Sequence, residues 1–339
     1  MVAMGPGMSG DQNNGNPSFT VCICTRNRVK YLGPTIESVL AQKVSSGAFD
    51  VLVVDNGSTD GTSEMIAARF GRGTCEPVRC IREEVPGLSR ARNRAIAETI
   101  GDFIVFLDDD AIPEPGWLQA IVAGFGAAEI QVVGGAVVPA YEQAPPPWWS
   151  ARIELVFAPH VSTFERHRVS QGEYPHGANI AFRRAVFARV GLFREDLGYS
   201  GNKLIPAEES ELLLRIEKSG GAILYEPAAV VRHLIPASRM DRKYLRARFY
   251  GAGLASHELE KTRRHDVERW GFRQILDGWA RGFRLYVAAR AVIHATFRMT
   301  DGTSFDRELT ARFQAGQAVA LVREAIRQFK SRLVRGQTP

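Results

Sequence analysis

Apolar runs and helically spaced segments alternate along the first third of the chain. Four short runs have the composition of buried strands, and the segments between them place apolar residues at helical spacing. Strands that alternate with helices of about ten residues are typical of βαβ units, whose strands pair in parallel. We therefore predict an α/β fold with a mostly parallel, twisted sheet flanked by helices. The predicted strands are Phe19–Cys24, Val51–Val54, Val78–Arg82 and Phe103–Leu107, and the predicted helices are Tyr31–Gln42, Ser63–Phe70 and Ser89–Thr99.

The second half of the chain has a less regular pattern. Its strand-like runs are short, and from about Ser238 onward the spacing is helical throughout. The clearest helix covers residues 311–335, whose apolar positions fall on one stripe, whereas 281–298 mixes Arg290 and His294 into the apolar side. The predicted strands are Gln131–Val138, Asn179–Phe182, Ala222–Tyr225 and Val230–Val231; the predicted helices are Trp117–Gly126, Arg183–Val190 and Glu208–Ser219; the stripe consists of Ala315, Val319, Val322, Ile326, Phe329 and Leu333.

The composition is that of a globular protein, but the charge is unevenly distributed. Residues 239–339 hold 21 Lys and Arg against 10 Asp and Glu, within a chain of net charge +6. Such a basic region suggests an anionic partner, namely a membrane surface, nucleic acid or a phosphorylated substrate; an ordinary solvated helix face is the alternative. No clean run of 18 apolar residues predicts a membrane span. Residues 1–17, rich in Gly, Asn and Ser, are predicted to be a disordered leader rather than a signal peptide.

The four cysteines predict free thiols rather than a zinc site. Cys22 and Cys24 are separated by one residue, which is too few for the paired ligands of a zinc site. Cys75 and Cys80 therefore lack a matching pair. Reduced thiols fit a cytosolic protein.

Acidic residues follow two of the predicted strands. Asp108–Asp110 directly follows Phe103–Leu107, and adjacent carboxylates are costly unless a cation lies among them. Mg²⁺ and Mn²⁺ prefer such oxygen ligands, often together with substrate phosphates, so this segment predicts a site for a metal ion and a diphosphate. Asp55 ends another strand and could accept a hydrogen bond from a base or a ribose. A solvated acidic turn at Asp108–Asp110 and a capping role for Asp55 are the alternatives.

Other candidate residues follow later strands or begin helices. Glu208 and Glu209 begin a predicted helix, where they could act as a general base or simply complement the helix dipole. His233 follows a strand and could be a metal ligand or a structural histidine. The pair Arg92–Asn93 could reach a phosphate or the acidic segment, or serve only its helix. The stiff loop Pro145–Trp149 could equally be the wall of a substrate site or plain packing.

Several common catalytic motifs are absent. No GxxxxGK[ST] occurs, and no complete GxGxxG follows a strand, which argues against P-loop and classical dinucleotide-binding proteins. GxSxG and HExxH are also absent, which argues against serine hydrolases and zincins.

Taken together, the chain resembles the family 2 inverting glycosyltransferases of GT-A fold over about residues 18–240. Six segments carry this resemblance because they occur in matching order and spacing. They are FTVCICTRNR, VLVVDNGSTDGT, VPGLSRARNRAI, GDFIVFLDDDAIPEPGWL, HGANIAFRR and AEESELLLRI.

The resemblance implies roles for the matching residues. Asp110, with Asp108 and His233, is expected to bind Mn²⁺ or Mg²⁺, and a His…Arg element matches His233 and Arg239. Glu209 falls at the position of the catalytic base, where the family usually has Asp, so Glu208 stays an alternative base. The expected donor-binding residues are Thr25, Arg26, Asn27, Asp55, Arg92, Asp108 and Asp109, and the expected acceptor residues are Trp148, Trp149 and Asn179.

The resemblance also implies an organisation and an activity. We expect a leader at 1–17, a GT-A catalytic domain at 18–240 with a nucleotide-binding half (18–115) and an acceptor half (116–240), and a basic helical extension at 241–339. The expected activity is inverting transfer from a nucleotide-sugar, with a UDP-sugar favoured, to a saccharide or lipid-linked acceptor in bacterial-type polysaccharide or glycolipid assembly. The expected location is cytoplasmic, with peripheral contact to the inner membrane through the C-terminal helices and no nucleic-acid partner.

Two other functions stay open at this point. A nucleotidyltransferase acting on a sugar phosphate could use a similar sheet and acidic site, although no Gly-rich loop followed by Lys lies near the first strand. A non-enzymatic basic protein that binds membranes or nucleic acid is supported only by the charge of the C-terminal third.

Overall fold

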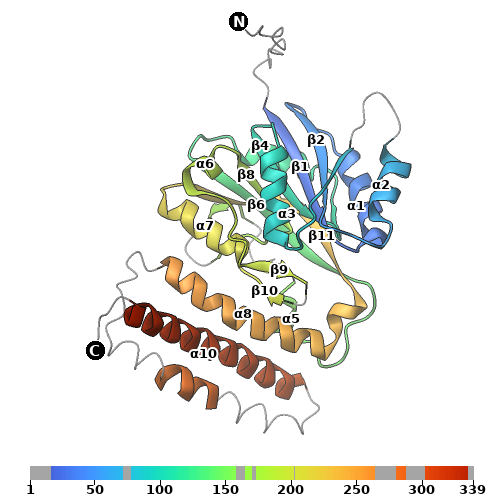
Figure 1. The fold of residues 1–339 in the computed structure, drawn as a ribbon. Helices are drawn as coiled ribbons and strands as arrows, with labels where there is room; N and C mark the ends of the chain where they lie inside the picture. Colours follow the sequence, from blue (N-terminus) through green and yellow to red (C-terminus); the bar gives the residue numbers. More distant parts are fainter. Residues whose placement is uncertain are drawn as a thin grey trace, which may run out of the picture.

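The computed structural model describes residues 17–71, 78–157, 165–169, 173–201, 203–263, 280–287 and 302–334 (Figure 1). The leader up to residue 16, Cys75 and most of the segment 281–298 lie outside this part of the chain. The strands are β1 (Ser18–Thr25), β2 (Ala48–Asp55), β3 (Val78–Arg82), β4 (Phe103–Asp108), β5 (Ala111–Pro113), β6 (Ile130–Tyr141), β7 (His167–Arg168), β8 (Asn179–Arg183), β9 (Gly198–Ser200), β10 (Lys203–Ile205) and β11 (Ala222–Ile235). The helices are α1 (Val29–Leu40), α2 (Thr62–Phe70), α3 (Leu88–Glu98), α4 (Trp117–Gly124), α5 (Ala151–Glu154), α6 (Val186–Val190), α7 (Glu208–Lys218), α8 (Arg242–Arg263) and α10 (Gly302–Val334), with a 3-10 turn at Ala237–Met240.

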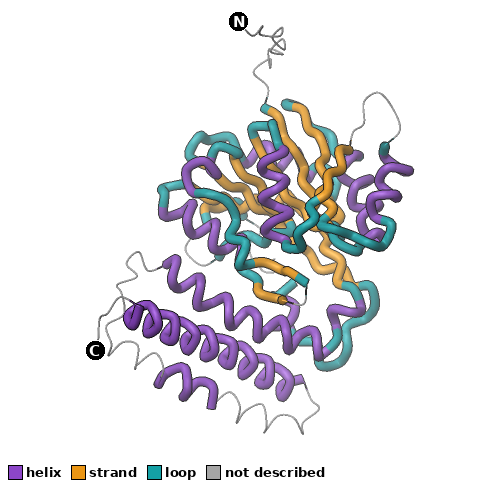
Figure 2. The backbone as a smooth tube through the Cα atoms, viewed as in Figure 1, coloured by secondary structure: helices purple, strands orange, loops and turns teal. Residues whose placement is uncertain are grey.

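One mixed sheet forms the centre of the molecule. Among the described residues its strand order is β3–β2–β1–β4–β8–β6–β11–β5, and β7 pairs with β11. The strands β3, β2, β1 and β4 are parallel to their neighbours, whereas β8 runs antiparallel to β4 and β6. Helices α1 and α2 cover one face and α3 and α7 the other (Figures 1 and 2). The mostly parallel sheet between helices is thus confirmed.

Alternation along the strands divides the core into two layers. In β1, Val21 and Ile23 are fully buried against α1 and α4, whereas Cys22 points to the other face. That second face packs Ala91 and Ala95 of α3 and the inward side of α7 against the sheet. Successive side chains of a strand point to opposite faces, so a strand buried on both faces is apolar throughout. The thiol of Cys22 is buried, and this burial raises its pKa to about 12.

Strand β11 is longer than the two short strands predicted for this segment. The two short strands Ala222–Tyr225 and Val230–Val231 are one continuous strand that pairs with β6 over most of its length. The register shifts between Glu226 and Val230, where Pro227 interrupts the run. Because proline has no N–H for the ladder, a bulge absorbs it and the strand continues to Ile235. This continuation carries His233 to the edge of the sheet where the functional residues gather.

The C-terminal helices lie side by side below the strand ends in Figure 1. Arg246 pairs with Glu308 and Lys261 with Glu324, so α8 and α10 run in the same direction. Close approach depends on glycine, because a Cβ on Gly316 would lie 2.2 Å from the carbonyl oxygen of Tyr250. No helix within the described ranges is long and apolar enough to cross a membrane.

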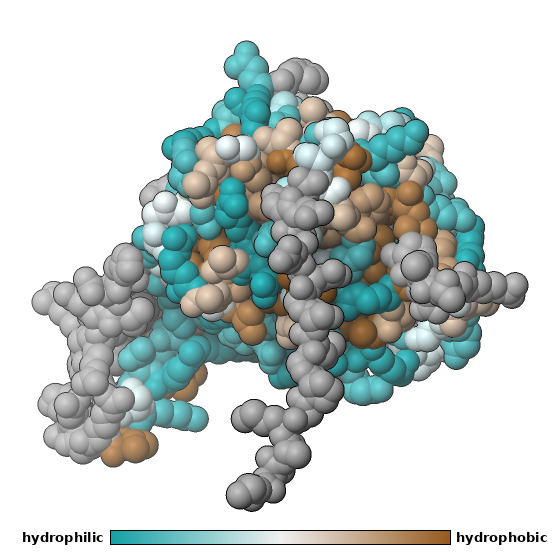
Figure 3. All heavy atoms as spheres, turned by 90° about the horizontal axis from the view of Figure 1, so that it is seen from above, coloured by the Kyte–Doolittle hydropathy of each residue, from teal (hydrophilic) through white to brown (hydrophobic). Residues whose placement is uncertain are grey.

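The packed face of α10 coincides with the predicted apolar stripe only in part. Val319 and Val322 are half-buried and lie against the segment 280–287, where they line a pocket with Gly282 and Phe283. The helix buries small residues such as Ala311, Ala318 and Ala325. Of the stripe, Ala315 is buried, but the side chains of Ile326 and Phe329 are 38% and 41% exposed. Small residues let the axes of α8 and α10 approach closely. The larger side chains near the C-terminal end of α10, Ile326 and Phe329, then face outward. The view from above in Figure 3 shows another face, on which hydrophilic and hydrophobic areas are mixed.

Candidate active site

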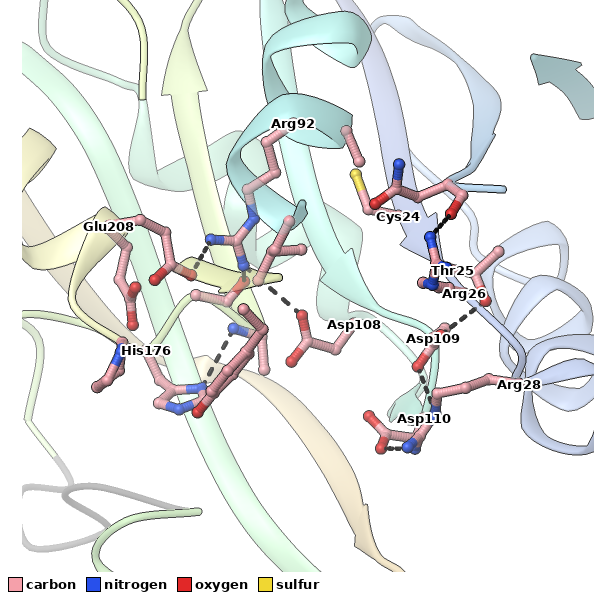
Figure 4. A pocket seen from close by; sticks show the side chains of 18 of the residues that line it. Cys24, Thr25, Arg26, Arg28, Arg92, Asp108, Asp109, Asp110, His176 and Glu208 are labelled. Carbon is pink, nitrogen blue, oxygen red and sulfur yellow. Dashed lines mark hydrogen bonds and ion pairs between the residues drawn. The ribbon is translucent and has the colours of Figure 1, made fainter. Parts of the chain in front are cut away.

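A cavity of about 250 Å³ lies at the carboxyl ends of β1 and β4. The segment after β1, the acidic residues after β4, the starts of α3 and α7, the residues before β8 and the end of β11 form its walls (Figure 4). Open α/β sheets bind ligands at this edge, because loops after adjacent parallel strands meet there. Most of the polar residues singled out in the sequence therefore converge on one cavity.

Asp110 is the most strongly paired carboxylate of the cavity. Its side chain is 1% exposed, pairs with Arg28, and lies 3.4 Å from Nη1 of Arg239 and 3.1 Å from Nε2 of His233. Burial acts to raise the pKa of Asp110, but Arg239, His233 and Arg28 outweigh it and hold the pKa well below its usual range. Asp110 is therefore ionised at neutral pH and surrounded by positive charge.

His233 has the hydrogen bonding expected of a metal ligand. Its Nδ1 lies 3.0 Å from the carbonyl oxygen of Phe157. A carbonyl can only accept, so Nδ1 carries a proton and Nε2 points toward Asp110. Burial acts to lower the pKa of His233, but the charge of Asp110 outweighs it and raises the pKa, so the protonated ring is favoured while Nε2 faces only Asp110. A bound cation would take the place of the proton on Nε2. This buried Nε2 has no hydrogen bond of good geometry within the described chain, although Asp110 is near. Asp108, Asp110 and His233 place one ligand atom each within 4.8 Å of one another, so these residues fit a divalent cation.

Asp109 and Thr25 join the ends of β4 and β1. Thr25 Oγ1 donates to Asp109 Oδ2 at 2.7 Å, and Arg28 Nε lies 3.0 Å from Asp109 Oδ1. Burial, opposed by Arg28, raises the pKa of Asp109 to about 7. The hydroxyl of Thr25 is thus used within the protein, where it fixes the loop that bears Arg28 beside the acidic segment.

The start of α7 aims two glutamates at the cavity. Ala207, directly before the helix, has φ +86°, a left-handed conformation that is costly for a residue with a Cβ. Glu208 is buried and accepts a 2.9 Å hydrogen bond from Nη1 of Arg92. Glu209 is less buried, and its Oε2 accepts no hydrogen bond from any described residue. The helix N-terminus stabilises negative charge here.

The two glutamates share one proton at neutral pH. Burial and the charge of Glu209 raise the pKa of Glu208 to about 8, against the opposing effect of Arg92. Burial also acts to raise the pKa of Glu209, but the charge of Arg92 outweighs it and lowers the pKa. Two such carboxyls titrate as a unit. Glu209 is therefore the ionised member of the pair, and within the described chain it forms no ion pair, because Arg92 bonds Glu208 instead. A general base requires this ionised state.

Arg92 is a buried arginine that lies between two carboxylates of the cavity. Its guanidinium lies between Glu208 and Asp108, with the Asp108 oxygen at 3.7 Å, and only 4% of its side chain is exposed (Figure 4). It also donates to the carbonyl oxygen of Gly177. The adjacent Asn93 bonds the backbone of Phe193 in both directions and is structural. Arg92 thus links the end of β4 to the start of α7 at the wall of the cavity.

Arg92→Met is expected to lower the free energy of unfolding by about 3–5 kcal/mol, because it leaves the negative charge of the Glu208–Glu209 pair buried without its cation. Urea denaturation measures this loss. The matched control is Arg90→Met on the same helix, whose ion pair with Glu195 is 42% exposed on both sides and is expected to contribute less than about 1 kcal/mol. Equal, small losses in both variants would show that the bridge carries no stability.

Other predicted donor residues shape the loops around the cavity. Arg26 lines it and donates to the carbonyl oxygen of Asn56 at 2.7 Å. Asn27 joins two loops, since its N–H donates to Ser58 and its side-chain oxygen accepts from Thr59. Asp55 is fully buried and accepts from the N–H of Ser58, from Ser63 and from Arg82. In this structure the side chains of Asp55 and Asn27 therefore stabilise the loops beside the cavity and do not line the cavity itself.

Asn179 is not an acceptor residue, and that prediction is wrong. Its side chain is fully buried at the start of β8. Its oxygen accepts from Trp117 Nε1 at 2.8 Å, and its amide donates to the carbonyl oxygens of Ala136 and Ala229. These bonds satisfy buried polar groups inside the sheet, so no atom of Asn179 is left for a substrate.

Trp148 and Trp149 line neither of the two cavities described here. Trp148 packs edge-on against Phe305 of α10, and Trp149 stacks on Phe157, with ring centres 5.6 Å apart. Of the two interpretations of this loop, packing is the one its contacts support. The acceptor role predicted for the two tryptophans is corrected accordingly, although Trp149 does support Phe157, which lines the first cavity.

Three cavity residues had no predicted role. Arg28 lies in the TRNR segment, one residue beyond the predicted donor residues, and His176 lies in the HGAN segment. Arg248 is one of many arginines in the basic extension, and only its position relative to the sheet distinguishes it. Burial lowers the pKa of His176 to about 4, so its ring is neutral at pH 7.

This sheet, with an acidic cavity at its strand ends, is that of a GT-A-type transferase. Residues 20–191 match the family model described as "Glycosyl transferase family 2". The chain belongs to this family and is a glycosyltransferase.

Relatives agree with this membership. The glucosyl-dolichyl phosphate glucuronosyltransferase of Haloferax volcanii is 27% identical over 245 residues, which are 72% of this chain and 77% of the relative. Succinoglycan biosynthesis protein ExoM of Rhizobium meliloti is 25% identical over 291 residues, or 80% and 89% of the two chains. Among solved structures, a mannosyltransferase from Pyrobaculum calidifontis, in complex with GDP-Man and Mn²⁺, has TM-score 0.55 and 18% identity over 93% of this chain and 88% of its own. The last likeness shows the fold alone.

Proposed function

We propose that the protein transfers a sugar from a nucleoside-diphosphate sugar to an acceptor hydroxyl in one displacement, with inversion at the anomeric carbon. The observation that carries this proposal is the presence, in one cavity, of the Asp108–Asp110–His233 group and of an ionised Glu209 that forms no ion pair within the described chain. The relatives support a nucleotide-sugar donor, since one carries the name of a glucuronosyltransferase and a solved neighbour holds GDP-Man and Mn²⁺. A UDP-sugar donor and Mn²⁺ or Mg²⁺ as the ion are parts of the proposal.

In the proposed reaction, Glu209 removes the proton from the acceptor hydroxyl as the oxygen attacks the anomeric carbon. Arg92 and the proton shared with Glu208 keep the negative charge on Glu209. Arg28 and Arg239, beside Asp110, place fixed positive charge where the leaving diphosphate gains negative charge. A divalent ion held by Asp108, Asp110 and His233 would act as a Lewis acid on that diphosphate.

Thermal unfolding with UDP, GDP and dTDP, each with and without Mn²⁺, tests this function. A ligand at about 100 times its Kd adds about 2.7 kcal/mol, which for a chain of 339 residues is about 4 °C in Tm. We expect one nucleotide to stabilise the chain only when Mn²⁺ is present. Equal Tm values in all conditions would contradict the proposed donor site.

Family membership decides between the functions that the sequence left open. A glycosyltransferase releases a nucleoside diphosphate, whereas a nucleotidyltransferase consumes or releases pyrophosphate. Helix α8 forms ion pairs on two sides: its Arg246 pairs with Glu308 of α10, and its Glu258 pairs with Arg194, which precedes β9. No observation in the described chain favours a nucleic-acid partner.

We also propose that the far end of α10 contacts the cytoplasmic face of a membrane. Ile326, Phe329 and Val334 are 38%, 41% and 88% exposed, and they alternate with exposed basic residues such as Arg327 and Lys330. A helix with outward apolar side chains among cations binds anionic lipid surfaces. A lipid-linked acceptor would be reached at the same surface.

The double variant Ile326→Asp/Phe329→Asp is expected to weaken binding to phosphatidylglycerol vesicles by about tenfold, because it replaces apolar contacts with like charge. Vesicle flotation measures the bound fraction. Ile100→Asp, at an 87% exposed position outside α10, is the control and is expected to bind as the wild type does. Unchanged flotation of the double variant would contradict contact through this helix.

A further inference from the structure

A second cavity, of about 370 Å³, adjoins the first at the proposed base. The two cavities share Glu209, His176 and Arg248 in their linings, so the carboxylate of Glu209 is reached from both sides. Asp108, Asp109 and Asp110 line the first cavity, and none of these three aspartates lines the second. The second is built by α5, the start of α7, α8 and α10, the helices that lie across the strand ends in Figure 1.

The second cavity contains two arginines without a carboxylate partner. Within the described chain, neither Arg248 nor Arg152 forms an ion pair, whereas nearby Arg246 and Arg312 both pair with Glu308. Arg248 lies 5.3 Å from the ring centre of Tyr199, and Arg152 donates to the hydroxyl of Thr310. Guanidinium groups are suited to phosphoryl oxygens, which they bind through two parallel hydrogen bonds. An anion in this cavity would find Arg248 beside Glu209 and Arg152 farther along the wall.

The remaining walls of the second cavity are largely apolar. Phe249 and Phe313 come from α8 and α10, and Leu155, which follows α5, is 52% exposed. Arg152 is also exposed, so this end of the cavity combines an outward apolar side chain with a cation. The inner end, at Glu209 and Arg248, is polar. A ligand that fits both ends has a polar, anionic head and an apolar tail.

We propose that this second cavity binds the acceptor, and that the acceptor carries a phosphoryl group held by Arg248 and attached to an apolar chain. The inference rests on the proposed function, because it takes Glu209 as the base that receives the acceptor proton. The phosphoryl group is not transferred and no bond to it changes. Its role is to place the acceptor hydroxyl beside Glu209, opposite the donor.

Calorimetric titration of the full chain, with saturating nucleoside diphosphate and Mn²⁺ to occupy the first cavity, tests the proposal. The probes are hexyl phosphate, inorganic phosphate and uncharged hexyl glucoside. We expect hexyl phosphate to bind most tightly and Arg248→Gln to weaken it about tenfold or more, since a charge-assisted bond pair is lost. Arg248→Lys is expected to restore part of the affinity. Lys243→Gln, an exposed charge on the same helix, is the matched control.

The outcomes distinguish a phosphoryl group attached to an apolar chain from free phosphate. Tighter binding of hexyl phosphate than of inorganic phosphate supports a lipid-linked acceptor, and equal binding of the two would overturn the apolar part of the proposal. Equal loss in Arg248→Gln and Lys243→Gln, or hexyl glucoside binding as tightly as hexyl phosphate, would overturn the phosphoryl contact. If Arg248→Gln unfolds, Arg248→Lys keeps the charge without the paired hydrogen bonds and is expected to bind hexyl phosphate more weakly than the wild type does; unchanged affinity would overturn the phosphoryl contact. Nucleotide titration of Arg152→Gln reports on the proposed function separately, because Arg152 lines the second cavity and not the first.

Discussion

Glu209→Gln is expected to reduce turnover by about 10²–10⁴-fold, because an amide cannot take the proton from the acceptor hydroxyl. The nucleotide-dependent rise in Tm is expected to persist in this variant, since Glu209 does not belong to the Asp108–Asp110–His233 group. Steady-state turnover and thermal unfolding, measured on the same preparation, separate the loss of chemistry from a loss of binding.

Two further variants show which of the two glutamates acts as the base. Glu209→Asp keeps a carboxylate, and the family usually has Asp there, so it is expected to retain much more activity than Glu209→Gln. Glu208→Gln resembles the protonated state of Glu208 and can still accept the hydrogen bond from Arg92. It is therefore expected to stay within about tenfold of the wild-type turnover. A larger loss in Glu208→Gln than in Glu209→Gln would identify Glu208 as the base instead.

Asp110→Asn is expected to weaken Mn²⁺-dependent nucleotide binding by about 100-fold and to reduce turnover by about 10³-fold. The substitution removes the charge that Arg28, Arg239 and His233 surround, and it takes one of three oxygen or nitrogen ligands from the group. Calorimetric titration with nucleotide, with and without Mn²⁺, measures the change.

The control for this variant is Asp102→Asn. Asp102 lies at the opposite end of the strand segment, where it accepts from Ser18 and is exposed. The Asp102→Asn substitution removes the same charge at a position outside the cavity, so nucleotide binding is expected to stay unchanged. A metal-dependent affinity that survives unchanged in Asp110→Asn would mean that Asp110 is not a ligand of the ion. Nucleotide binding that does not depend on Mn²⁺ would mean that the diphosphate is held by the arginines alone.

The sequence predicted what depends on local pattern. The strands that carry Thr25, Asp55 and Asp108 are apolar runs followed by polar loops, and parallel pairing necessarily brings those loops to one edge. The acidic segment could therefore be assigned to a ligand site at this edge before any coordinates, whereas it was the resemblance to a family that assigned the two glutamates and His233 to the same site. The resemblance to a family supplied their order of importance.

What the sequence did not predict depends on contacts between distant segments. Asn179 has the polarity of a site residue, but its partners are carbonyl groups of β6 and β11 that only the folded sheet brings near. The sequence predicted two short strands, Ala222–Tyr225 and Val230–Val231, whereas pairing with β6 joins them into β11 through a bulge at Pro227. In the sequence, Arg248 cannot be distinguished from the other arginines of the basic extension. Only the fold shows that α8 brings it to the cavity that contains Glu209.

The most direct test of this account is the product released from nucleotide-sugars without added pyrophosphate. The wild type, incubated with UDP-, GDP- and dTDP-sugars and Mn²⁺, is expected to release nucleoside diphosphate from one of them, with water or an added acceptor attacking the sugar. Glu209→Gln is expected to bind that donor and release almost none. Release that is equal in wild type and Glu209→Gln, or no cleavage of any donor by the wild type with an acceptor present, would contradict base-assisted sugar transfer at this site.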